Sequence, residues 1–164
     1  NAGGSSSTYA STQEALNQLS DALFYLEKEV KEMKLAVPAG VSQCDADFCP
    51  EARESVRADY SKEKLLSNIR AFRAIFTGGE AEGFDDLLVD VGAQELADQM
   101  SAAIDAAEAS VDGWSGSMRA QLESDPDSVV DTHAKFDALG DLLKTQFVGT
   151  LNLELPQRAE GDND

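Results

Sequence analysis

The clearest periodicity in the chain lies in LNQLSDALFYLEKEVKEM, residues 16–33, and it sets the fold class. Its apolar residues recur in steps of three and four, at Leu16, Leu19, Leu23, Leu26, Val30 and Met33. This spacing places them on one face of a helix that packs against other helices. Ser11 and Glu14 have the spacing of a capping box at its start, and Pro38 with Gly40 ends it. We therefore expect one long first helix.

The rest of the chain repeats the helical pattern. A second helix is expected from Ser61, with the seam Leu65, Ile69, Phe72 and Phe76 and a stop at Gly78-Gly79. A brief connecting helix is expected over residues 84–89.

Two more long helices follow. The third is expected to carry an apolar face from Leu96 to Leu122, kinked rather than broken near Gly113 and Gly116. Asp125-Pro126 begins the fourth, whose seam is Val129, His133, Phe136, Gly140, Leu143 and Phe147. No alternation typical of strands competes. The sequence predicts an all-α fold, an up-and-down four-helix bundle with a long, disulfide-fastened first connection.

The charge of the chain excludes some partners. Among 164 residues, 31 Asp and Glu oppose 13 Lys and Arg, for a net charge of −18. A chain this acidic repels phosphate backbones and anionic bilayers, so nucleic acid and a bare membrane surface are not expected partners. The acids either attract cations and basic ligands or only keep the surface solvated.

The two cysteines predict a disulfide. Cys44 and Cys49 are separated by four residues, which does not fit the CxxC redox motif, and two ligands alone do not make a zinc site. A bond between them would fasten the long connection at residues 37–60, and closing so small a loop stabilises by about 2 kcal/mol. It also requires an oxidising compartment such as a periplasm.

The two ends of the chain differ from its middle. We expect residues 1–10 to be a remnant of cloning, Asn1-Ala2, followed by a flexible Gly/Ser-rich tether. Such a tether is typical of bacterial lipoproteins, which favours a periplasmic location with a lipid anchor in the outer membrane. Residues 11–155 form the single bundle, and residues 156–164 an acidic tail.

Several stretches in order resemble the C-terminal half of imelysin-family proteins. They are KLAVPAG at 34–40, the Cys44–Cys49 loop with Pro50-Glu51, NIRAFRAIFTGG at 68–79, GFDDLL at 83–88, LELP at 153–156 and the ending EGDND. The resemblance covers about residues 13–164. It implies a periplasmic protein of the kind built from two helical bundles, often linked to iron acquisition and in some cases classed as a metallopeptidase.

The family motif Gly-x-His-x-x-Glu, which belongs to the N-terminal half, has no match in this chain. The only histidine, His133, has Asp131 where the motif has Gly and Phe136 where it has Glu. No site residue is therefore carried over from the family. The chain is either the C-terminal half of a two-bundle protein or a single-bundle relative.

His133 remains the candidate metal ligand because it is unique. It could bind iron or another divalent metal together with Asp131 or Asp137, of which Asp137 lies one helical turn away. A zinc or iron site normally needs three or four protein ligands, and His133 also lies on the apolar seam. A packed structural histidine is therefore the favoured interpretation, and metal binding is the alternative.

These observations predict a binding or interaction module associated with iron or other metal-ion acquisition. No catalytic constellation occurs in the chain, so the module is expected not to catalyse a reaction by itself. Its expected partner is another protein or a complementary helical bundle. One alternative is the C-terminal half of an imelysin-type metallopeptidase whose metal site lies elsewhere. Another is a structural lipoprotein of the envelope.

Overall fold

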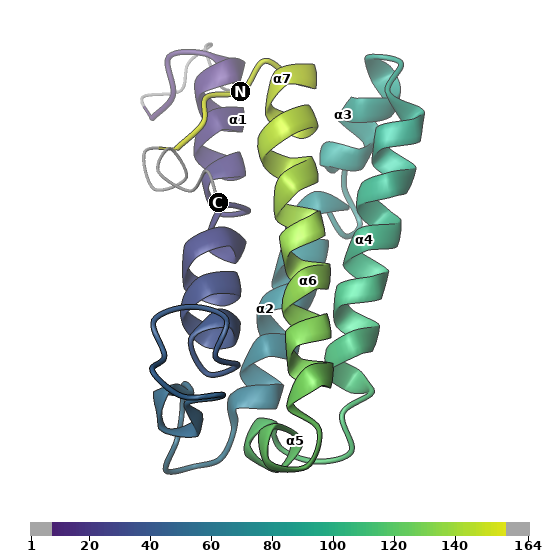
Figure 1. The fold of residues 1–164 in the computed structure, drawn as a ribbon. Helices are drawn as coiled ribbons and strands as arrows, with labels where there is room; N and C mark the ends of the chain where they lie inside the picture. Colours follow the sequence, from purple (N-terminus) through teal and green to yellow (C-terminus); the bar gives the residue numbers. More distant parts are fainter. Residues whose placement is uncertain (1–7, 157–164) are drawn as a thin grey trace.

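The computed structural model describes residues 8–156, and every regular element in this range is helical (Figure 1). The elements are α1 (Thr12–Asp21), the π-helix η1 (Leu26–Ala36), the short 3₁₀-helix η2 (Pro50–Ala52), α2 (Ser61–Phe76), α3 (Phe84–Asp90), α4 (Gln94–Asp112), α5 (Met118–Ser124), α6 (Pro126–Leu142), the π-helix η3 (Leu143–Phe147) and α7 (Val148–Thr150). The all-α prediction is confirmed. Most of the expected tether and most of the expected acidic tail lie outside the described residues.

The long helical segments run side by side along one axis (Figure 1). η1 packs against both α2 and α6, and α4 packs against the same two helices. Their facing apolar side chains form one core, which includes Phe24, Leu35, Ile69, Phe76, Met100, Ile104, Phe136 and Phe147. α3 packs on α4, while α5 lies across the end of the molecule and contacts α6 (Figure 1). Among residues 8–156, none of the helices combines the length and apolar character that crossing a membrane requires.

The first helix is not the uniform α-helix that its periodicity predicts. After α1, the backbone tightens into bonds between residues three apart, such as Leu26 N to Leu23 O at 3.1 Å. It then widens into the π-helix, in which Val37 N donates to Glu32 O at 3.1 Å. Bonds that span five residues put more than 3.6 residues in each turn. The buried positions therefore come in pairs, at Leu26 and Glu27, Val30 and Lys31, and Leu35 and Ala36.

The expected seam of this first segment is correct only in its middle. Leu23, Leu26 and Val30 are buried, but Leu19 and Met33 are 49% and 58% exposed. Met33 turns outward because the wider π-helical turn moves it off the buried face. The capping box is shifted by one residue. Ser11 Oγ accepts from the backbone N–H of Glu14 as expected, whereas Glu14 Oε2 accepts from Ala10 N at 2.6 Å.

The expected continuous third helix is wrong, because the chain breaks between α4 and α5. Lys62 Nζ donates to the carbonyl oxygens of Asp112 and Trp114, at 3.0 and 2.7 Å, and so binds the end of α4. Ser117 Oγ then accepts from Ala120 N and caps α5. These two interactions favour a turn where the glycines already weaken the helix. The apolar residues on both sides of the break stay buried.

The other predicted helices agree closely with the structure. The seam of α2 is buried, and α3 covers the expected short segment. Ser61 is the first residue of α2 rather than its cap, and its hydroxyl donates to Glu54 O. The fourth helix begins at Pro126 as expected and continues through η3 into α7.

Candidate functional site

Six ionisable side chains gather between η1 and the fourth helical segment, and we call them the η1–α6 charged cluster. η1 contributes Glu27, Lys31 and Glu32, α6 contributes His133 and Asp137, and η3 contributes Lys144. The π-helix places Glu27 and Lys31 on the buried face beside Leu26 and Val30. Charged groups thus sit inside a packed helix interface.

Lys31 is the centre of this cluster. Its Nζ lies 3.1 Å from Glu27 Oε2, 3.0 Å from Asp137 Oδ1 and 3.5 Å from Glu32 Oε1. Lys144 Nζ approaches the same Glu27 oxygen at 3.0 Å. The side chains of Glu27 and Lys31 are only 1% and 6% exposed. Charges this deep need partners with good geometry, which the cluster supplies from three elements.

The carboxylates hold Lys31 in its charged form. Burial by itself lowers the pKa of an ammonium group, but the pKa of Lys31 is raised well above its ordinary value. The hydrogen bond to Asp137 and the neighbouring charge of Glu27 outweigh the burial. The cluster therefore keeps Lys31 charged among the side chains of Glu27, Glu32 and Asp137.

Two atoms of the cluster have no hydrogen-bond partner although they are buried. One is Glu27 Oε1, and the other is His133 Nε2, which lies 3.9 Å from Glu32 Oε1. Glu27 Oε1 fits because Gly140 has no side chain, since a Cβ at that position would lie 1.7 Å from it. Orphaned buried polar atoms are unusual and often mark functional or strained positions. The cluster is therefore the first candidate site.

The predicted metal ligands do not come together as one group. Asp137 is bound to Lys31, His133 faces Glu32, and Asp131 is exposed outside the cluster. Over residues 8–156 there is no set of three or more His, Cys, Asp or Glu side chains arranged to hold a metal ion. Binding of a metal by His133 remains a prediction.

Sequence analysis missed Glu27, Lys31, Glu32 and Lys144. On an α-helical wheel, Glu27 and Lys31 flank the apolar seam without belonging to it, so their charge makes the solvent-facing edge the simpler assignment. A signal was present in Gly140, a glycine on an otherwise apolar helix face, which indicates close approach of another group.

A second candidate site is an open groove between the first helical segment and α2, which we call the α1–α2 groove. It has two adjoining parts, of about 280 and 500 Å³, that share Ile75. The smaller part runs along η1 and the middle of α2, and the larger part lies between α1, the end of α2 and α3. Most of its lining is apolar, including Leu16, Leu19, Phe72 and Leu87. A cleft with this lining suits an apolar surface of a ligand or partner.

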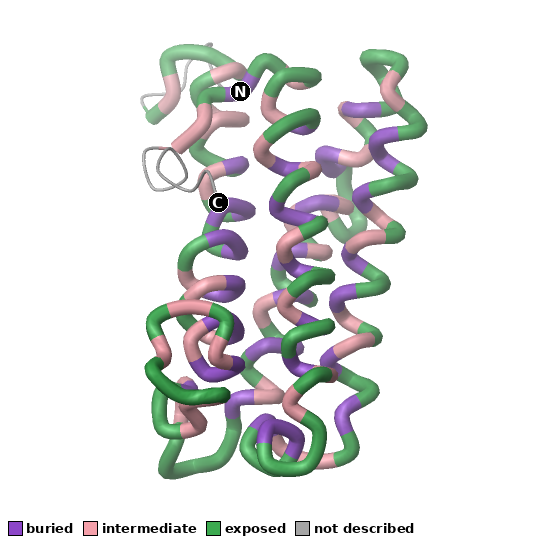
Figure 2. Tube along the Cα trace, in the orientation of Figure 1, coloured by how far each residue is buried: buried purple, intermediate pink, exposed green. Residues whose placement is uncertain are grey.

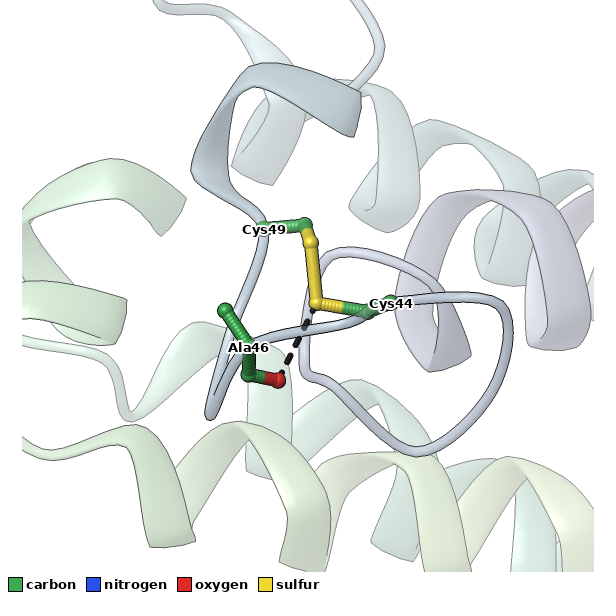
Figure 3. Close-up of a disulfide and its surroundings, with 3 residues drawn as sticks. All are labelled: Cys44, Ala46 and Cys49. Atoms are coloured by element: carbon green, nitrogen blue, oxygen red, sulfur yellow. Dashed lines mark hydrogen bonds between the residues drawn. A yellow bond between two sulfur atoms is a disulfide. The ribbon is translucent and has the colours of Figure 1, made fainter.

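The predicted disulfide is present and ties the long connection together (Figure 3). Cys44 and Cys49 are bonded, with their Cα atoms 6.0 Å apart. Cys44 Sγ lies 3.3 Å from Ala46 O, and since a disulfide sulfur carries no hydrogen this is a close contact. Cys49 N donates to Pro38 O at 2.9 Å, which holds the loop against the end of η1. The loop is a fastener and contributes no residue to the charged cluster or the groove.

Comparison with known proteins identifies a family. The model of the imelysin family, peptidase M75, matches residues 2–146, which include the charged cluster and the α1–α2 groove. No curated protein and no solved structure matches the chain.

Proposed function

Because the chain belongs to the imelysin family, we propose that it is a periplasmic binding and interaction module that serves iron or other metal-ion acquisition. It does not catalyse a reaction by itself and works through a partner protein or a complementary helical bundle. The α1–α2 groove is the observation that carries this proposal, because an open apolar cleft needs a partner to cover it.

The proposed architecture is an up-and-down four-helix bundle. The contacts of η1 and α4 with both α2 and α6 support it, since they link four long segments in a closed ring. In such bundles, ligand sites are built from side chains on facing helices. The η1–α6 charged cluster has this position.

The proposed location is the periplasm, with a lipid anchor in the outer membrane. The Cys44–Cys49 bond supports an oxidising compartment, because cytosolic thiols are kept reduced. The Gly/Ser-rich composition of residues 3–8 supports a tether. Mass spectrometry of the protein from native membranes tests the anchor, and a free, unacylated N-terminus would rule it out.

The metal role is proposed for His133 and its neighbours. His133 Nε2 has no hydrogen-bond partner and faces Glu32 Oε1, and Asp137 lies one turn further along α6. Imidazole and carboxylate are ligands that Fe²⁺ and Zn²⁺ both accept. Asp131 would join them only if its exposed side chain turned toward His133.

Calorimetric titration of the metal-stripped protein with Fe²⁺, Cu²⁺ and Zn²⁺ tests the metal role. A self-contained site gives one-to-one binding with a Kd of about 1 μM or tighter, lost in the His133→Ala variant. Asp112→Ala serves as the control, because it removes an exposed acid of α4, a helix that contributes no residue to the cluster. Binding that is weak, screened by salt and equal in both variants would show that the metal role does not reside in this chain.

A metallopeptidase whose metal site lies outside this chain is the alternative, favoured by the peptidase family match. A Gly-x-His-x-x-Glu motif in the same or a neighbouring reading frame would support it. Joining that protein to this chain and assaying peptide hydrolysis with and without a chelator would decide between the two functions.

A further inference from the structure

α1 is an amphipathic helix whose apolar side chains are only partly covered. The only residue that it buries is Ser20. Leu19 is 49% exposed, and Leu16 is only partly buried. Figure 2 shows α1 mostly in the colours of exposed and intermediate residues, in contrast to the buried stripes of α4 and α6. Exposed leucines at helical spacing are typical of a face that binds another element.

The partly covered apolar face of α1 continues into the α1–α2 groove. Thr12, Leu16 and Leu19 form one wall of its larger part, opposite Ile75 and Leu87. On α2, the lining extends from Asn68 to Ile75, which corresponds to about 11 Å of helix, and it continues beyond the end of α2 at Gly78. This length and the helical walls on both sides suit an amphipathic helix of about two to three turns, laid in the groove with its apolar residues inward.

The charges at the groove favour a basic occupant. The charged residues among those that line its two parts are Asp21 and Glu82, both acidic, and no Lys or Arg is found in this described lining. The whole chain carries −18. A second copy would bring an equal negative charge to the same face, which opposes self-association.

We propose that the α1–α2 groove binds an amphipathic helix from a partner protein, with apolar residues on the inner face and Lys or Arg on the flanks. This inference rests on the proposed function as an interaction module and names the chemistry of its partner. It involves no metal, so its test and the metal titration fail independently.

The probe is a fluorescein-labelled synthetic peptide of 14 residues, with Leu on one helical face and Lys elsewhere, titrated with the full chain at 150 mM KCl. Fluorescence anisotropy measures the affinity. The comparison peptides are a shuffled version of the same composition and a version with Glu in place of Lys. The variants are Leu19→Glu in the groove and Met33→Glu as the matched control, since Met33 is similarly exposed but lies outside the groove. Circular dichroism verifies that both variants keep their helices.

We expect the Leu/Lys helix to bind at least about tenfold more tightly than either comparison peptide. Leu19→Glu should weaken its binding about tenfold, although the added negative charge attracts the peptide more strongly. Met33→Glu should bind as the wild type does or slightly more tightly.

Four results would overturn the proposal. Equal binding of the shuffled peptide, or no loss in Leu19→Glu, would show that charge alone attracts the probe. If the peptide with Glu bound as tightly as the peptide with Lys, the partner would not need to be basic. A dimer in sedimentation equilibrium that Leu19→Glu dissociates would make a second copy the occupant.

Discussion

Glu27 shows how one residue depends on the absence of a side chain elsewhere. Its carboxylate is buried among two lysines, and its Oε1 lies against Gly140 of α6. In an exposed helix, Gly→Ala would stabilise by about 1 kcal/mol. Here the new Cβ would meet Glu27 at 1.7 Å, so the buried carboxylate or the helix must move.

We therefore expect Gly140→Ala to lower the free energy of unfolding by about 1–3 kcal/mol despite its better helix propensity. Urea denaturation followed by circular dichroism measures the change. Gly149→Ala is the control, because a Cβ there has no neighbour within 4 Å and the substitution should be neutral or stabilising. Equal effects of the two variants would mean that Gly140 is not needed for the packing of Glu27.

Lys31 compensates the charge of the carboxylates around it. Lys31→Met keeps the apolar length of the side chain but leaves Glu27 buried with Lys144 as its remaining ion-pair partner. We expect a loss of about 3 kcal/mol in the free energy of unfolding at pH 7, at the low end for a broken buried pair. Adding Glu27→Gln to Lys31→Met should recover part of this loss, which a double-mutant cycle measures.

The pH range for this experiment follows from the raised pKa of Lys31. The stabilising contribution of Lys31 is complete below the pKa of about 10.4 that a lysine has in the unfolded chain. It is lost as the pH rises through the raised pKa that Lys31 has in the folded protein. The difference between wild type and Lys31→Met should therefore stay constant from pH 6 to 9. Strictly additive losses in the double variant would show that Glu27 and Lys31 do not depend on each other.

At the scale of elements, α-helical periodicity predicted α2, α3 and the start of α6 well, because their seams follow the steps of three and four that the backbone adopts. It failed in η1, where the sequence is equally compatible with an α-helix. The wider turn is favoured there by tertiary packing, which buries Glu27 and Lys31 against α6. The charged cluster could not be predicted for the same reason, since its residues come together only through this change of helix type.

α2 and α4 are joined by a set of charged hydrogen bonds on their outer side. Glu108 accepts from Arg70 at 2.7 Å and from Arg73 at 2.9 Å, and Arg73 also reaches Asp105 at 2.7 Å. The hydrogen bond from Arg70, aided by Arg73 and opposed by burial, lowers the pKa of Glu108. The stabilisation that the charge of Glu108 provides is thus complete above the pKa of about 4.3 that a glutamate has in the unfolded chain. It is lost as the pH falls through the lowered pKa of Glu108 in the folded protein.

We expect Glu108→Gln to cost about 1 kcal/mol of unfolding free energy at pH 7 and much less at pH 3. Urea denaturation at both pH values measures the difference. Glu123→Gln is the control, because its pair with Arg119 lies within the short helix α5 and joins no two elements. A loss in Glu108→Gln that is the same at pH 3 and pH 7 would show that the charge of Glu108 is not the cause.

At the scale of the molecule, composition and periodicity were sufficient for the helical class, the disulfide and the acidic surface. The groove was not predictable, because the seam rule assumes that every apolar face of a helix is covered by the same chain. Leu16 and Leu19 follow that rule in spacing but lie at an open cleft. Only the position of α1 in the fold distinguishes these two leucines from core residues. Because no other helix of the described chain covers them fully, they support the proposal of a partner.

The charge of −18 acts on the molecule as a whole, beyond any single pair. Raising KCl from 10 to 150 mM shortens the screening length from about 30 to about 8 Å, which weakens repulsion across the molecule. The Glu27–Lys31 pair spans about 3 Å and is buried, so the same salt hardly screens it. We therefore expect the thermal midpoint to rise with KCl by about 2–4 °C, equivalent to about 1 kcal/mol. Scanning calorimetry measures the thermal midpoint, and MgCl₂ at matched ionic strength is the comparison. If MgCl₂ raises the midpoint as much as KCl does, the effect is general screening. If MgCl₂ raises it more, the acidic side chains bind divalent cations. A midpoint that falls with KCl would show that exposed ion pairs contribute more to stability than the repulsion removes.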